Sequence, residues 1–248
     1  MDYLYAVRNA EQLESYQTFA KKHEQRLKDY LTFLADVYAL EDLPEVIIWS
    51  DKEIATRYIR DIAVPAYTND LRMVITPELP VWQELYSKQL NDFEETDQTF
   101  RLYQHYQNLS ERHLLQIVGH ELAHWSELFL DDFDDDKTSD IWFEEGMVEY
   151  ISRRYFLTEQ EFLDEKVVNQ ELVALFQEKY GWHSLSKFGQ KTYQGSYASI
   201  FYEYWRSFLA IDHLVDKLGS VKAVFSSYHD WAESKRTLTL LEWFELED

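Results

Sequence analysis

Two histidines spaced one helical turn apart are the residues of this sequence best suited to chemistry. They occur in His120-Glu-Leu-Ala-His124, inside a stretch predicted to be helical from a cap at Ser110 to about Leu130. Side chains four residues apart project from one face of a helix, so both imidazoles can reach a single ion. Zinc takes nitrogen ligands at ~2.0–2.1 Å and, in catalytic sites, keeps one position open for water. Glu121 would lie beside that position, and we predict that it acts as the general base.

A third protein ligand is needed, because catalytic zinc usually takes three. The segment Trp142-Phe-Glu-Glu-Gly-Met-Val-Glu-Tyr150 predicts a second helix, which could pack antiparallel to the first and present a carboxylate from its opening turn. Glu144 and Glu145 are both candidates, and helical geometry lets only one of them point at the ion. Glu149 lies one turn after Glu145, where it could accept a hydrogen bond from the outer nitrogen of a ligand histidine.

Together the two segments resemble the gluzincin metallopeptidases, the clan of thermolysin and the zinc aminopeptidases. In those aminopeptidases the third ligand is the Glu before Gly in a Trp-x-x-Glu-Gly motif, which Glu145 matches in Trp142–Gly146. In the thermolysin-type arrangement an acidic residue follows the ligand by four positions, as Glu149 does here. The linking segment is slightly longer than in either group, so Glu144 stays an alternative. The resemblance covers roughly residues 60–225. It implies a zincin-like fold, Zn²⁺ as cofactor and a peptide or protein as substrate.

The aminopeptidase-like members also carry a tyrosine that hydrogen-bonds the developing oxyanion, on a helix that closes at a glycine fifteen residues later. Tyr204 and Gly219 have that spacing, so the resemblance implies Tyr204 as a second catalytic residue. Tyr193 and Tyr197 are alternatives, because the sequence from Tyr193 to Ser196 looks more like the surroundings of such a tyrosine. The chain has no Gly-x-Met-Glu-Asn segment, with which aminopeptidases grip a free amino terminus, so aminopeptidase specificity is not implied.

The composition is that of a folded globular chain. Of 248 residues, 46% are apolar and only 6 are glycine and 4 proline, which excludes general disorder. The absence of cysteine excludes a disulfide framework, a zinc ribbon and a thiol nucleophile. The apolar runs fall far short of the ~18 residues that cross a bilayer, and no secretory leader is visible. We therefore expect a cytoplasmic location.

The charge balance bears on the partners. The sequence has 24 basic and 46 acidic residues, a formal net charge of −22. Such a field repels phosphate backbones and anionic lipid heads, so we expect no nucleic-acid partner and no membrane partner. The acidic run Asp131–Asp136 favours a solvated loop between two helices. The sequence does not indicate the oligomeric state.

The elements that must position these residues begin with a helix from Leu13 to Tyr38, whose apolar residues recur at three- and four-residue steps. Short strands are predicted at Glu45–Trp49 and on both sides of a turn at Asn69-Asp70. After Pro77 and Pro80 the pattern is helical to the end of the chain. The later helices include one that begins at Thr158 and ends at Gly181, and another that ends at Gly219.

Strands early and helices late predict an α+β fold, with a small N-terminal sheet followed by a mainly helical C-terminal part and no βαβ alternation. We expect a single zincin-like domain over residues 1–248: a helix and sheet in 1–76, the zinc helices in 110–156 and the C-terminal helices in 158–248. The strand near Leu71–Thr76 is expected to be an edge along which an extended peptide could add.

Three functions are compatible with these features. A zinc-dependent peptidase is favoured. A catalytically silent zinc-binding module with an interaction or regulatory role is the alternative within the same fold. An acidic interaction protein, such as a mimic of nucleic acid in which the histidine pair is a coincidence, is the third. The zinc content of the protein separates the last from the first two.

Overall fold

The computed structural model describes residues 1–130, 140–193 and 195–246. The chain is α+β, as the sequence predicts. It comprises two compact units: unit 1 consists of Met1–Glu127 and Ile151–Glu159, and unit 2 of Leu128–Tyr150 and Gln160–Asp248. Helix α5 (Ile141–Phe156) runs without interruption through the residues where the division falls. The acidic run Asp131–Asp136 lies outside the described residues.

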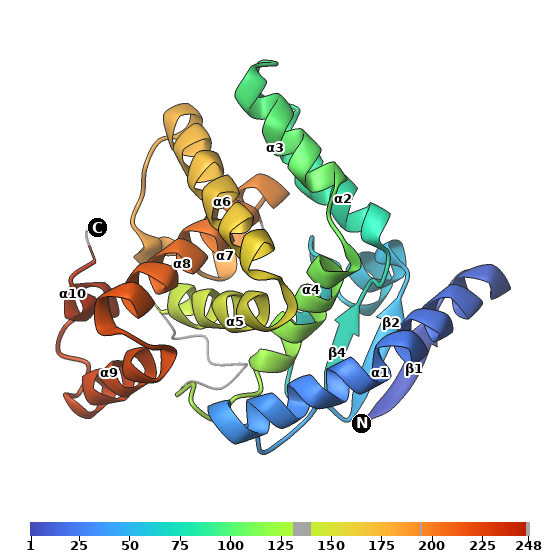
Figure 1. Cartoon of the computed structure of the whole chain (residues 1–248), viewed down its shortest axis with the longest axis horizontal. Helices are drawn as coiled ribbons and strands as arrows, with labels where there is room; N and C mark the ends of the chain where they lie inside the picture. Colours follow the sequence, from blue (N-terminus) through green and yellow to red (C-terminus); the bar gives the residue numbers. More distant parts are fainter. Residues whose placement is uncertain (131–139, 194, 247–248) are drawn as a thin grey trace. The chain divides into compact units, whose positions relative to one another are not determined.

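Unit 1 is built on a four-stranded sheet in the order β1-β2-β4-β3 (Figure 1). The first three strands in this order are parallel, and β3 pairs antiparallel with β4. The turn between β3 and β4 is the predicted one, since Asn69 Oδ1 accepts hydrogen bonds from the N–H groups of Leu71 and Arg72. The bounds of the strands are β1 (Asp2–Ala6), β2 (Val46–Ser50), β3 (Ala66–Thr68) and β4 (Arg72–Ile75).

Two expectations about this sheet are wrong. The sequence pattern predicts no strand before the first helix, but β1 pairs in parallel with β2 along its whole length. Because α1 (Ala10–Tyr38) connects β1 to β2, the chain begins with a βαβ unit after all. The strand at Arg72–Ile75 is interior, since β2 and β3 flank it on either side. The edge on that side of the sheet is therefore β3.

Apolar residues cover both faces of the sheet. On one face Trp49 is fully buried, with the rings of Tyr3 and of Phe19 from α1 at 5.9 and 5.7 Å between centroids. On the other face Tyr67 and Val74 pack with Ala55 of the short helix η1 (Ile54–Ile59). Burial of this apolar area is the main force that holds the helices on the sheet.

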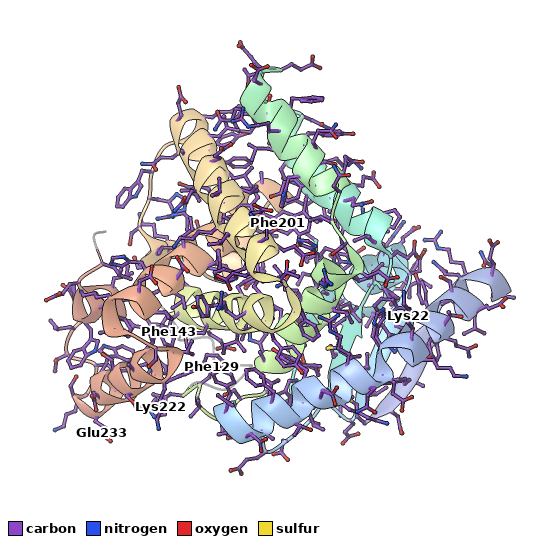
Figure 2. The ribbon with its side chains drawn as sticks, viewed as in Figure 1. Lys22, Phe129, Phe143, Phe201, Lys222 and Glu233 are labelled. Atoms are coloured by element: carbon purple, nitrogen blue, oxygen red, sulfur yellow. The ribbon has the colours of Figure 1, made fainter. Side chains whose placement is uncertain are left out.

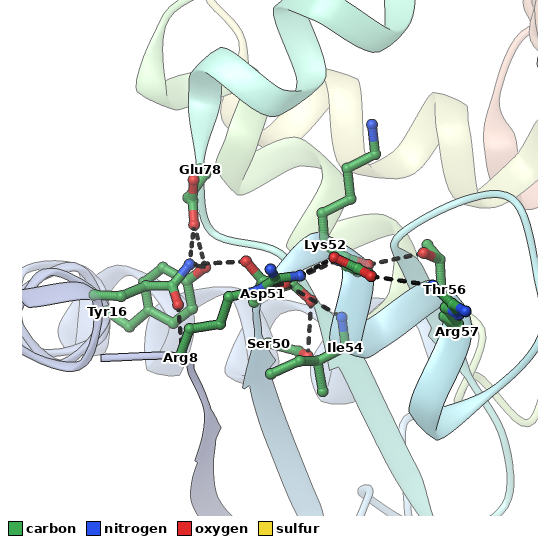
Figure 3. Close-up of polar contacts among 11 residues, drawn as sticks. Arg8, Tyr16, Ser50, Asp51, Lys52, Ile54, Thr56, Arg57 and Glu78 are labelled. Atoms are coloured by element: carbon green, nitrogen blue, oxygen red, sulfur yellow. Dashed lines mark hydrogen bonds and ion pairs between the residues drawn. The ribbon is translucent and has the colours of Figure 1, made fainter. Parts of the chain in front are cut away.

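A polar network ties the carboxyl ends of the parallel strands to α1 and α2 (Figure 3). Asp51, which follows β2, accepts hydrogen bonds from Arg8 Nε at 2.9 Å and Gln12 Nε2 at 3.1 Å. Tyr16 on α1 donates to Glu78, the residue before α2. Partial burial raises the pKa of Asp51, but the hydrogen bonds from Gln12, Arg8 and the N–H of Ile54, together with the charge of Arg8, lower it by more, so the net pKa is below its usual value.

The remaining helices of unit 1 pack beside the sheet. Tyr86 of α2 stacks on Tyr106 of α3 with 5.1 Å between ring centroids, and these helices lie side by side (Figure 1). Pro80 lies in the first turn of α2, where its missing N–H costs nothing. The bounds are α2 (Leu79–Ser87), η2 (Lys88–Leu90), α3 (Asp97–Gln107) and α4 (Glu111–Ala123).

Unit 2 is helical in its described residues, with an aromatic core. Phe143 of α5, labelled in Figure 2, stacks on Tyr228 at 4.4 Å and on Phe244 at 5.8 Å between ring centroids. Gly181 and Gly219 adopt φ angles of 83° and 88° at the predicted ends of α6 and α8. The bounds are α6 (Glu159–Tyr180), η3 (Leu185–Lys187), α7 (Gln190–Tyr193), α8 (Tyr197–Leu218), α9 (Val221–Glu233) and α10 (Leu240–Phe244). Every helix among the described residues is too short or too polar to span a bilayer.

Candidate metal centre

Helix α4 carries the histidine pair and is almost entirely buried. Ser110 caps it as predicted, because its hydroxyl accepts a hydrogen bond from the N–H of Arg112 at 3.3 Å. The helix packs against β3, β4 and α1, so His120 and Glu121 are only 5% and 6% exposed. Burying an imidazole and a carboxylate costs free energy. Ionisable groups placed in such surroundings are candidates for a functional site.

The two histidines face each other. His124 follows the last residue of α4, but its backbone keeps helical angles, φ −58° and ψ −21°, so it stays one turn from His120. The Nε2 atoms of the two rings are 3.3 Å apart. A tetrahedral zinc ion with bonds of ~2.0–2.1 Å holds neighbouring ligand atoms about 3.3–3.4 Å apart. The pair therefore has the spacing that a zinc ion requires.

The helix that carries the pair is shorter than the sequence predicts. A helix to about Leu130 was expected, but α4 ends at Ala123. Beyond this point the backbone turns to the end of α1, where Ser126 pairs with Leu40 in an isolated β-bridge. The N–H of Glu127 donates to the carbonyl of Ala39 instead of to a carbonyl of α4. A local sequence pattern cannot indicate a hydrogen bond between residues so distant in the chain.

The edge strand β3 lies next to this end of α4. Trp125 donates from its indole Nε1 to Thr68 Oγ1 at 2.8 Å, which fixes the end of the helix to the strand. Burial raises the pKa of Tyr67, also on β3, to about 12, and the negative charge of Glu121 contributes to this rise. Glu121 is therefore within electrostatic range of the strand that forms the edge of the sheet.

The C-terminal half of α5 is held on α4 by specific contacts. Gln116 Nε2 donates to Ser152 Oγ at 3.1 Å. Gly119 leaves room for the ring of Phe156, since a Cβ at this glycine would come within 2.4 Å of the ring. The carbonyl of Gly119 also accepts a hydrogen bond from the hydroxyl of Tyr30 at 3.0 Å. Within unit 1, these contacts hold the residues of α5 from Ile151 onward against the helix that carries the histidines.

Glu145 lies two turns before Ser152 on the same helix, and only 7% of it is exposed. His120, His124 and Glu145 each offer one ligand atom, and these atoms all lie within 4.8 Å of one another. Glu144 does not belong to this group, which is the one group of this kind among the described residues. Two imidazole nitrogens and a carboxylate oxygen are a donor set that zinc accepts. The residues present therefore fit the ion that the sequence implies.

Two of the three candidate tyrosines contact Glu145. Tyr204 on α8 donates to Glu145 Oε1 at 3.1 Å, and Tyr193 on α7 donates to the same oxygen. The two hydroxyl oxygens are 3.4 Å apart. Tyr197 begins α8, and its ring stacks on Phe201 with 6.1 Å between centroids. Sequence reasoning proposed these tyrosines for the substrate oxygen only, and no motif indicates a contact with Glu145.

Glu149 is half-buried on α5, one turn after Glu145. That this carboxylate accepts a hydrogen bond from a ligand histidine stays a prediction. Sequence reasoning missed the link from Trp125 to Thr68, because it joins an indole to a strand 57 positions earlier in the chain. Only a prediction of which helix end meets which strand could have found it.

Comparison of the chain with protein-family models, with curated proteins and with solved structures finds no match. The resemblance to the gluzincins therefore rests on the residues and motifs themselves.

Proposed function

We propose that the protein is a zinc-dependent hydrolase of the gluzincin type that cleaves peptide bonds. The observation that carries this proposal is the convergence of ligand atoms from His120, His124 and Glu145 to within 4.8 Å of one another. The α+β fold, in which α4 packs against the edge strand β3, supports a zincin-like architecture for the chain. The proposed substrate is a peptide or a protein segment in extended conformation.

The substrate would lie along β3. An extended peptide can add to the edge of a sheet through main-chain hydrogen bonds, and β3 is the edge strand that contacts α4. The hydrogen bond from Trp125 Nε1 to Thr68 Oγ1 holds this strand at the end of α4, the helix that carries the histidines. A scissile carbonyl held on β3 would thus be near Glu121 without any rearrangement of the sheet.

The proposed chemistry needs a proton acceptor that later becomes a donor. Zinc held by His120, His124 and Glu145 would lower the pKa of water to about 7 and polarise the scissile carbonyl. Glu121 would accept the proton of the attacking water and deliver it to the leaving amine. The hydroxyl of Tyr204 would donate a hydrogen bond to the carbonyl oxygen as negative charge develops there.

The decisive variant is Glu121→Gln. It keeps the size and shape of the side chain and all three ligands, so bound zinc is expected to stay at one ion per chain. Without a proton acceptor, hydrolysis of a fluorogenic peptide library should fall by roughly 10²–10⁴-fold. Zinc content is measured by mass spectrometry of metals on the same samples. Glu84→Gln is the matched control, because Glu84 is on the surface of α2 in an ion pair with Lys88.

Each outcome is informative. Hydrolysis by Glu121→Gln at the wild-type rate would show that the assigned mechanism is wrong. Wild-type protein that holds zinc but cleaves no member of the library would favour the zinc-binding module over the enzyme. Protein that takes up no zinc would exclude both.

A further inference from the structure

The carboxylate of Glu145 is held by two phenol groups of the same unit. Tyr193 and Tyr204 both donate to Oε1, Tyr204 at 3.1 Å. The ring of Phe188 packs against both tyrosines, with 5.7 Å between ring centroids in each case. The two hydroxyls therefore come to one oxygen from different helices, α7 and α8, supported by one shared apolar side chain.

This arrangement divides the two oxygens of the carboxylate between two tasks. A carboxylate oxygen has about two lone-pair sites, so two hydrogen bonds occupy those of Oε1. A metal ion would then bind through Oε2. Groups that hydrogen-bond to a metal ligand, without binding the metal themselves, commonly fix the orientation of that ligand in this way. The hydroxyls thus favour one-oxygen binding over binding through both oxygens.

The two hydroxyls are not equivalent. The hydroxyl of Tyr193 comes from the short helix α7, and that of Tyr204 comes from the long helix α8. The proposed function assigns Tyr204 to the substrate oxygen, so Tyr204 is the residue that must release Glu145 Oε1 for its hydroxyl to reach that oxygen.

We propose that Tyr193 is a positioning residue, which holds Oε1 of Glu145 and makes this side chain a one-oxygen zinc ligand while Tyr204 is released to the substrate. The proposal rests on the proposed function and assigns to Tyr193 a role different from contact with the substrate. It also explains why two tyrosines meet at one carboxylate: one keeps the ligand in place while the other takes part in the reaction.

The test measures zinc affinity without any peptide, by competition with a chromophoric chelator. Tyr193→Phe should bind zinc roughly 10–100-fold more weakly than the wild type. Tyr202→Phe is the matched control on α8: among the described residues the buried hydroxyl of Tyr202 has no hydrogen-bond partner, so its removal should leave the affinity within about twofold. Wild-type affinity in Tyr193→Phe would overturn the proposal. A wild-type protein that binds no zinc would overturn the proposed function instead.

A second readout separates the two tyrosines. Tyr204→Phe should lower kcat by roughly 10²–10³-fold and weaken zinc binding less than Tyr193→Phe does. The reverse order of zinc affinities would overturn the division of roles.

A third readout needs no variant, and so does not depend on whether Tyr193→Phe folds. X-ray absorption at the zinc edge of the loaded wild-type protein should show one oxygen from Glu145. Binding through both oxygens would contradict the proposal.

Discussion

Gly146 follows Glu145 directly, and at this residue α5 meets the backbone of another helix. A Cβ at Gly146 would come within 2.5 Å of the carbonyl oxygen of Ser207 and 2.6 Å of Ile211 Cγ1, both on α8. A flexible side chain can move away from such a contact, but a helix backbone cannot do so without shifting its neighbours. The glycine of the Trp-x-x-Glu-Gly segment thus has a packing reason in this chain, separate from any role in catalysis.

We therefore expect Gly146→Ala to lower the free energy of unfolding by about 1–3 kcal/mol, the usual cost of overpacking. Urea denaturation followed by circular dichroism measures the loss. Gly189→Ala is the control, because a Cβ at Gly189 would meet no atom closer than 4.0 Å. If both variants are equally stable, α5 and α8 do not approach as closely as described. Because Glu145 is the adjacent residue, zinc affinity should fall together with stability.

At the scale of elements, the regular patterns were sufficient to predict the long helices. The three- and four-residue steps predicted α1, and glycine at positive φ ended α6 and α8 where expected. The pattern failed where distant partners decide the structure. β1 is a strand because β2 lies beside it, and α4 ends at Ala123 because residues after it bond to the end of α1.

The same distinction applies to the candidate site. The spacing of His120 and His124 is a local property of a helix, so the sequence could predict that they share a face. Glu145 is more buried than Glu144, and this difference depends on packing within unit 2, where Phe143 stacks on α9 and α10. The contact of Tyr193 with Glu145 depends on a fold that brings together residues 48 positions apart.

The packing of α1 on α4 gives a prediction about pH. His23 on α1 is buried, with its ring 4.7 Å from that of Phe19 and its Nε2 3.4 Å from a carboxylate oxygen of Glu111 in the first turn of α4. Burial lowers the pKa of His23 below 6.5; Glu111 opposes this change, while Lys22 and Arg26 reinforce it. The folded state therefore prefers the neutral imidazole.

Because the unfolded chain binds the proton more readily, the stability that this histidine contributes is intact above pH 6.5 and is lost as pH falls through the lower folded-state pKa. His23→Gln should show a smaller drop in melting temperature between pH 7.5 and pH 5.5 than the wild type. The control is His213→Gln, since His213 is exposed on α8. An equal drop in wild type and His23→Gln would mean that protonation of His23 does not affect folding.

For the whole molecule, the surplus of negative charge and the proposed zinc centre both bear on the equilibrium between the folded and the unfolded chain. Even if each of the 24 basic residues paired with an acidic one, 46 − 24 = 22 carboxylates would be left over. Mutual repulsion among them disfavours the compact state. A dication bound by His120, His124 and Glu145, as proposed, would add two positive charges to the folded chain, and it would favour the folded state, in which one ligand atom of each residue lies within 4.8 Å of the others.

Zinc should therefore raise the melting temperature. At a free concentration 100 times the dissociation constant the stabilisation is about 2.7 kcal/mol, which corresponds to roughly 5–10 °C for a chain of this size. Differential scanning calorimetry in a chelator-buffered zinc solution measures the shift, and His124→Ala should abolish it while His213→Gln keeps it. The buffer matters, because so many carboxylates will bind zinc weakly at high concentration. A shift of the same size in His124→Ala would place the bound ion outside the histidine pair, and the proposed centre would then be wrong.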